Sequence, residues 1–188
     1  MKRSLSLAAR GAAACTLALS AAAAGAAPVS DAAQLARGAH LVETIGCADC
    51  HTPSVMGASG PQKDLALGFA GHPQALDVSP PPAPAGGWIW GGSASMTAFH
   101  GPWGVSYASN LTPDAETGLG HWSLEQFIAT MRSGRHLGNG RPLLPPMPWQ
   151  GIGKLDDGDL AAMFAYLQSL PAVANRVPGP LPPAVAAR

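Results

Sequence analysis

The 188-residue sequence is poor in charge and in cysteine, and its apolar stretches are short. Charged residues make up 12% of it, with 11 basic and 11 acidic residues. A chain without a basic excess lacks the electrostatic attraction to phosphates that nucleic-acid binding needs, which argues against that class. The apolar run at residues 11–23 is shorter than the roughly 20 residues that a helix needs to cross a bilayer. This apolar run is therefore too short to cross a bilayer easily as a helix.

The first 27 residues are typical of an export signal. Three basic residues within the first ten precede the apolar run, and Ala24-Gly25-Ala26 supplies the small residues that a signal peptidase needs. We predict a signal peptide at residues 1–27, with an uncleaved anchor as the alternative. The mature protein would then be periplasmic, and its membrane association at most peripheral. Cleavage would also remove Cys15, so that only two of the three cysteines remain.

The rest of the chain, about 160 residues, has the size of one domain, which we place at residues 28–171. The 23 glycines and 19 prolines predict long loops and few helices. We expect three helices, at residues 30–45, 123–134 and 156–171. The segments between them, residues 52–108 and 138–153, are expected to be irregular. A Pro-rich tail at residues 172–188 is expected to be extended and partly mobile.

Local signals mark the ends of these helices. Ser123 and Gln126 form the pattern of a capping box, and Asp156 is a suitable N-cap for the last helix. Gly38 lies on the broad apolar face of the first helix. We interpret it as the point of a close helix crossing, the alternative being a tolerated surface glycine.

Cys47-Ala48-Asp49-Cys50-His51 is the most specific motif in the chain. This C-x-x-C-H pattern is typical of a c-type haem attachment site. Cys47 and Cys50 would form thioether bonds to the haem vinyl groups, and His51 would be the proximal iron ligand. The export signal agrees with this interpretation, because the attachment takes place outside the bacterial cytoplasmic membrane.

Other interpretations of a C-x-x-C pair are a thioredoxin-like redox pair, a disulfide and half of a zinc site. A thioredoxin-like pair would follow a strand, whereas the residues before Cys47 have the pattern of a helix. A zinc site would need a second pair of ligands. The histidine directly after Cys50 favours haem attachment.

The sixth iron ligand decides between an electron carrier and an open, reactive site. Methionine is the usual ligand in carriers, and Met147 stands between prolines in a rigid loop. Met131 and Met163 fit core faces of helices, Met56 is close to the attachment site, and Met96 lies in a long loop. Five histidines remain rivals: His40, His72, His100, His121 and His136. Among these, His121 and His136 are favoured because they flank the helix that leads to Met147.

The chain resembles single-domain class I c-type cytochromes of bacteria, especially the cytochrome c domains found beside periplasmic dehydrogenases. Beyond the motif at residues 47–51, the resemblance rests on segments 107–114, 116–120, 122–123, 132–134, 145–149 and 165–171. The chain departs from the family in a Gly/Pro/Trp-rich insertion at about residues 71–104. This insertion, which contains Trp88, Trp90 and Trp103, either packs over the haem edge or forms a surface flap.

The resemblance implies an all-α, cytochrome c-like domain wrapped around one covalent haem c, with long irregular loops. It implies that the first and last helices cross, with Gly38 near Tyr166, and that His51 and Met147 are the axial ligands. The expected function is one-electron transfer between a dehydrogenase and an oxidase or quinone-linked complex, without catalysis by this chain itself. Two alternatives stay open: a haem enzyme or gas sensor with an open axial site, and a haem-free interaction module with a disulfide between Cys47 and Cys50.

Overall fold

The computed structural model describes residues 31–78 and 89–183. The predicted signal peptide and Trp88 lie outside the described residues. Five α-helices are present in these ranges: α1 (Asp31–Thr44), α2 (Cys47–His51), α3 (Leu124–Ser133), α4 (Trp149–Ile152) and α5 (Asp157–Gln168). The strands are β1 (Ser54–Gly57), β2 (Gly60–Lys63), β3 (Gly91–Gly92), β4 (Ala98–Gly101) and β5 (Gly104–Tyr107). No helix in the described ranges is long and apolar enough to cross a membrane.

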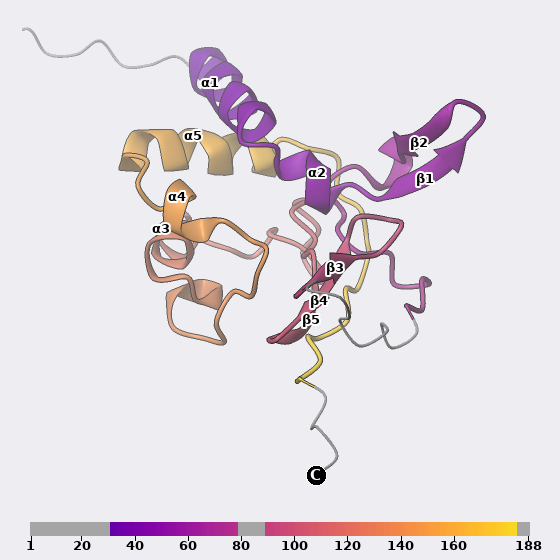
Figure 1. The fold of residues 1–188 in the computed structure, drawn as a ribbon. Helices are drawn as coiled ribbons and strands as arrows, with labels where there is room; N and C mark the ends of the chain where they lie inside the picture. The colour runs from indigo at the N-terminus through magenta and orange to yellow at the C-terminus, as the bar shows by residue number, and fades with distance from the viewer. Residues whose placement is uncertain (1–30, 79–88, 184–188) are drawn as a thin grey trace, which may run out of the picture.

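Helices α1, α3 and α5 form the core, as the sequence predicted. Helix α1 lies across α5, and α3 lies below α5 and α4 and packs against both (Figure 1). The buried core side chains come from these three helices and from the segments that join them: Leu41, Val42, Leu119, Phe127, Met131, Ile152, Leu160, Met163 and Leu167. Burial of this apolar surface is the main force that holds the helices together.

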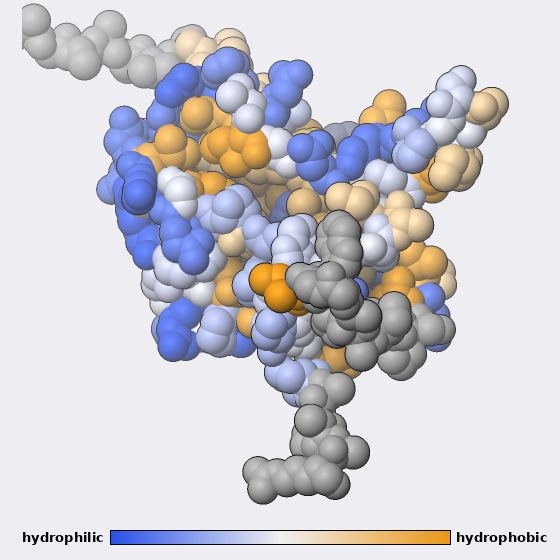
Figure 2. All heavy atoms as spheres, in the orientation of Figure 1, coloured by the Kyte–Doolittle hydropathy of each residue, from blue (hydrophilic) through white to orange (hydrophobic). Residues whose placement is uncertain are grey.

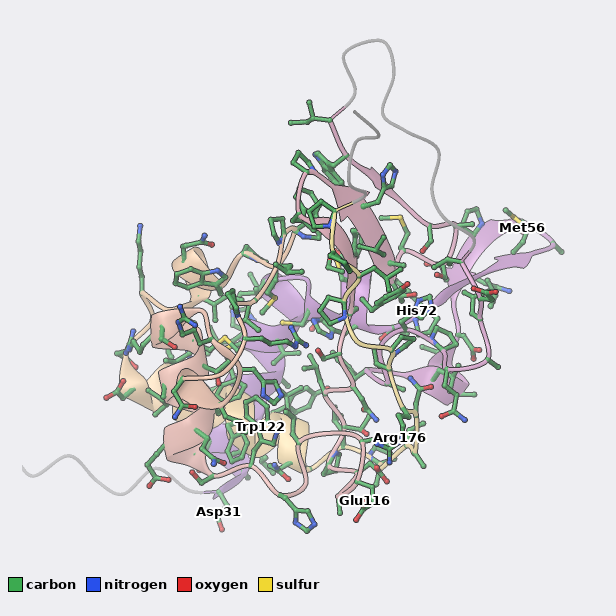
Figure 3. The ribbon with its side chains drawn as sticks, turned by 90° about the horizontal axis from the view of Figure 1, so that it is seen from below. Asp31, Met56, His72, Glu116, Trp122 and Arg176 are labelled. Carbon is green, nitrogen blue, oxygen red and sulfur yellow. The ribbon has the colours of Figure 1, made fainter. Side chains whose placement is uncertain are left out.

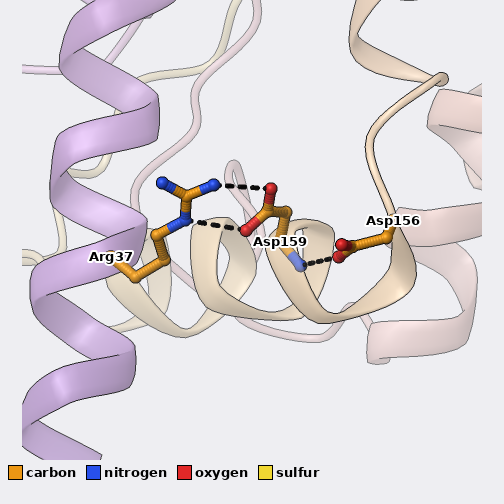
Figure 4. A network of polar contacts seen from close by, with 3 residues as sticks. All are labelled: Arg37, Asp156 and Asp159. Atoms are coloured by element: carbon orange, nitrogen blue, oxygen red, sulfur yellow. Dashed lines mark hydrogen bonds and ion pairs between the residues drawn. The ribbon is translucent and has the colours of Figure 1, made fainter.

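The predicted helix ends are confirmed. Ser123 accepts a hydrogen bond from the Gln126 amide and the Gln126 side chain accepts one from Ser123 N, which completes the capping box. Asp156 Oδ1 accepts a hydrogen bond from Asp159 N at 2.7 Å, so it caps α5. Asp159 in turn binds Arg37 of α1 through two hydrogen bonds of 2.8 Å (Figure 4). This surface ion pair links α1 to the first turn of α5.

The close helix crossing is also confirmed. A Cβ atom added to Gly38 would lie 2.0 Å from the Ala162 carbonyl oxygen and 2.8 Å from Tyr166 Cβ. The first of these contacts is to backbone, which cannot rotate away. Only glycine allows α1 and α5 to approach this closely.

Gly38→Ala is therefore expected to destabilise the protein by about 2 kcal/mol or more, because overpacking of a tight contact typically costs 1–3 kcal/mol. Urea unfolding followed by circular dichroism would measure this change. Gly151→Ala is the matched control, since an added Cβ there meets nothing within 4 Å. Equal unfolding midpoints for the two variants would contradict the crossing as a tight contact.

The expectation that residues 52–108 are irregular was wrong in part, and so the fold is not purely α-helical. β1 and β2 form an antiparallel hairpin in which Ser54 pairs with Lys63. β3, β4 and β5 form an antiparallel sheet in that order. The strands are only two to four residues long and rich in glycine, which leaves too little alternation to reveal them. The helix α4 within residues 138–153 was not predicted either, because its four residues are too few to show a helical periodicity.

The β1–β2 hairpin stands out from the body as a narrow arm at the upper right of Figure 2. Its Met56 is 78% exposed and lies at the far end of the arm in Figure 3.

The described part of the Pro-rich tail is extended, as expected, but it is held against the rest of the protein. Asn175 within it is only 3% exposed, and its side chain makes hydrogen bonds with the backbone of Ala70, His72 and Gln74.

Candidate haem site

Helix α2 carries the whole C-x-x-C-H motif. It starts after Gly46, whose φ of 79° lies in the left-handed region that favours glycine. This turn separates α2 from α1 and lets the five-residue helix begin at Cys47. Cys47 packs against the hydrophobic core, whereas Cys50 and His51 line a pocket beside it.

The imidazole of His51 is held in one orientation. Its Nδ1 lies 2.7 Å from the Ser109 carbonyl oxygen. A carbonyl can only accept, so Nδ1 carries the proton and Nε2 keeps its lone pair for a metal. Burial lowers the pKa of His51 and so favours the neutral form. Ser109 was not predicted as the partner, because the contact is made by a backbone carbonyl 58 residues away and leaves no side-chain signal.

The two cysteines are free thiols with suppressed acidity. Burial raises the pKa of Cys47 to about 11 and also raises that of Cys50. A thioredoxin-like pair depends on a lowered thiol pKa, so the environment argues against that interpretation. No three His, Cys, Asp or Glu side chains gather in a metal-binding group among the described residues.

The pocket has a volume of about 310 Å³, the lower end of the range for small-molecule sites. Apolar side chains from several elements form most of its walls, among them Phe99, Leu111, Leu119, Phe127, Leu143 and Leu144. Phe99 belongs to β4, so the insertion packs against the pocket. Neither Trp90 nor Trp103 lines it. Trp90 instead packs on the Phe99 ring, with centroids 6.4 Å apart.

Met147 lines the same pocket from the loop between α3 and α4. That loop is tied down at two points. Leu143 N donates to the Gly134 carbonyl oxygen at 2.8 Å, and Ser106 Oγ of β5 donates to the Pro145 carbonyl oxygen at 2.5 Å. The Pro145–Pro146 peptide bond is cis. Ser106 was missed by sequence analysis, since nothing in its neighbourhood suggests a contact with a loop 39 residues away.

The structure narrows the list of possible axial ligands. Met56, Met96 and Met163 do not line the pocket, nor do His40, His72, His100 and His121. Besides His51 and Met147, the pocket is lined by Met131 and His136. Met131 is 8% exposed within the hydrophobic core, and the His136 ring packs edge-on against Trp122 at 5.1 Å. Both therefore have structural roles already.

These residues fit a haem. The pocket combines apolar walls with one imidazole whose Nε2 is available, one thioether from a separate element and a cysteine beside the imidazole. Soft sulfur and imidazole nitrogen are suitable iron ligands. The other cysteine of the motif, Cys47, lies about one helical turn before His51.

Comparison with known proteins agrees with this geometry. The family model for cytochrome c matches residues 35–171. A nicotinate dehydrogenase subunit of Pseudomonas putida is 33% identical over 147 residues, which cover 78% of this chain and 9% of that protein. The cytochrome c subunit of the quinone-dependent alcohol dehydrogenase of Gluconobacter oxydans is 36% identical over 84 residues, 39% of this chain and 17% of the subunit. The fructose dehydrogenase cytochrome subunit of Gluconobacter japonicus is 35% identical over 72 residues, 38% of this chain and 15% of the subunit.

The chain thus spans less than a fifth of the length of each of these relatives. The family match itself covers most of the described residues and includes Cys47, Cys50, His51 and Met147. The fold, the pocket and the match together identify this chain as a member of the cytochrome c family, related to cytochrome subunits of dehydrogenases.

Proposed function

We propose that this chain is a periplasmic electron carrier that holds one covalent haem c. Cys47 and Cys50 would form the thioether bonds, and His51 and Met147 would be the axial ligands. The single observation that supports this most is the pocket itself, which is lined both by an oriented imidazole and by a thioether from a distant loop. When bound, haem c supplies a one-electron Fe(II)/Fe(III) couple.

The polypeptide has three tasks in this proposal. Ser109 fixes the His51 ring, so that Nε2 is presented without a change of tautomer. Ser106 and Gly134 hold the loop of Met147 through the bonds described above, which reduces the entropy lost when its thioether binds a metal. The apolar walls exclude water and so favour the less charged, reduced state.

The partner would be a dehydrogenase, because the relatives include cytochrome subunits of alcohol and fructose dehydrogenases. An oxidase or a quinone-linked complex would accept the electron. Docking between such partners is brief and buries little surface. The export signal predicted at residues 1–27 supports a periplasmic location for this exchange.

Redox titration of the purified holoprotein tests the proposal. We expect a reversible one-electron transition, with no binding of carbon monoxide to the reduced protein on mixing, because both axial positions are filled. Rapid stoichiometric binding of carbon monoxide would instead indicate an open axial site, as in a haem enzyme or gas sensor.

A further inference from the structure

Residues 172–183, hereafter the C-terminal strap, leave α5 and run to the β3–β5 sheet, as the yellow segment of Figure 1 shows. The strap is fixed near both ends. Val173 O accepts a hydrogen bond from Asn110 Nδ2 at 2.8 Å. Leu181 exchanges two backbone hydrogen bonds of 2.9 Å with Val105 of β5. The family match ends at residue 171, so the strap lies outside the part of the chain that the match covers.

Asn175 is the central anchor of the strap. Its Nδ2 donates to the carbonyl oxygens of Ala70 at 2.7 Å and His72 at 2.9 Å. Its Oδ1 accepts from Gln74 N at 2.8 Å, and its own backbone amide donates to Thr117 Oγ1 at 3.0 Å. A single buried side chain therefore joins the strap to the start of the inserted segment. Loss of this amide would leave the buried Ala70 and His72 carbonyl oxygens without these partners.

The five residues between Asn175 and Leu181 all line the haem pocket: Arg176, Val177, Pro178, Gly179 and Pro180. The two prolines stiffen this stretch. Gly104 of β5 makes the close approach possible, because a Cβ there would lie 2.0 Å from the Leu181 carbonyl oxygen. The stiff prolines of the strap and Gly104 of β5 therefore both favour the close approach of the strap to the sheet.

Arg176 brings charge to this wall. It lines the pocket together with Arg141 and Glu116, and Figure 3 shows Arg176 and Glu116 at the same end of the molecule. The pKa of Asp114 is lowered mainly by its hydrogen bond with Thr117, with a smaller contribution from the Arg176 charge. The Arg176 charge therefore acts on the Asp114 carboxyl as well as lining the pocket.

We propose that the C-terminal strap forms part of the haem site. In this proposal Asn175 is the residue that positions the strap. Arg176 is the cation that pairs with a haem carboxylate and raises the reduction potential. The inference rests on the function proposed above. Haem carries two carboxylates, and guanidinium groups bind carboxylates with two parallel hydrogen bonds. A fixed positive charge beside the haem disfavours the oxidised, more positive state. Without Arg176, the charge of Glu116, which also lines the pocket, would add to the effect by stabilising that state.

The first test compares Arg176→Gln with Arg135→Gln by potentiometric titration at low and high salt. Arg135 is an exposed arginine that does not line the pocket, so it controls for the change in net charge. The quantity compared is the ratio of reduced to oxidised protein at the midpoint potential of the wild type. We expect this ratio to be several-fold lower in Arg176→Gln. The difference should become smaller at high salt, because salt screens charges. Arg176→Lys should restore much of the ratio. Equal shifts in the two glutamine variants would overturn the proposal.

The second test is Asn175→Ala, assayed by limited proteolysis and by the same titration. We expect faster cleavage within the strap and a drop in the reduced-to-oxidised ratio at least as large as in Arg176→Gln. Faster cleavage with an unchanged potential would overturn the role of the strap. If Asn175→Ala does not fold, the comparison of Arg176→Gln with Arg135→Gln still tests whether the strap affects the reduction potential. A protein without covalent haem would refute the proposed function instead, so the two failures are distinguishable.

Discussion

Met147→Ala is expected to remove the sulfur-to-iron absorption band of the oxidised protein and to lower the reduction potential. Methionine ligation raises the potential of a His-ligated haem, and axial ligands shift haem potentials over roughly 0.8 V. We therefore expect a fall on the order of 0.1 V or more, within that range. The reduced variant should also bind carbon monoxide rapidly. Absorption spectroscopy and potentiometry measure all three effects.

Met56→Ala is the matched control for this experiment. Met56 is an exposed methionine on the β1–β2 arm and does not line the pocket, so its loss should leave the spectrum and the potential unchanged. Met131→Leu and His136→Ala test the two other candidate ligands that line the pocket, and both variants should keep the band. A band that survives in Met147→Ala but disappears in Met131→Leu would show that the ligand assignment is wrong, as would a wild-type protein without the band whose spectrum changes in His136→Ala.

The double variant Cys47→Ala/Cys50→Ala is expected to lose covalent haem and most of its folded structure. Without haem, the apolar walls of the pocket lose the group that they would pack against, and burial of apolar surface is the main force that stabilises a fold. The whole stability of a domain is only about 5–15 kcal/mol, so this loss is expected to unfold much of the chain. Haem staining after denaturing electrophoresis and far-ultraviolet circular dichroism would measure the two losses.

Cys15→Ala offers the control for the cysteine experiment. Cys15 lies in the predicted signal peptide, so its replacement should change neither the haem content nor the circular dichroism of the mature protein. Retention of haem after denaturation in the double variant would contradict attachment through Cys47 and Cys50.

The helical core was predictable from the sequence because its signals are local. The capping box of Ser123 and Gln126 lies within four residues, and the N-cap at Asp156 lies within the first turn of its helix. Gly38 could be interpreted because a glycine on an apolar helix face weakens the helix unless it permits a close contact. The haem motif at residues 47–51 is likewise contiguous.

The parts that were not predicted depend on contacts between distant segments. Ser109 acts through its backbone carbonyl, and Ser106 reaches a carbonyl of another loop. Asn175 joins the tail to residues more than a hundred positions earlier. The short strands β3 to β5 are stabilised by their pairing and by packing on the pocket, and residue preference contributes little. None of these contacts leaves a periodic or compositional signal.

The most direct test of the central claim is the intact mass of the mature protein, measured under denaturing conditions after expression in a host that matures c-type cytochromes. We predict the mass of the polypeptide without its signal peptide plus the mass of one haem, which remains bound because the linkage is covalent. A mass equal to the polypeptide alone, or lighter by the two hydrogens of a disulfide between Cys47 and Cys50, would contradict the account.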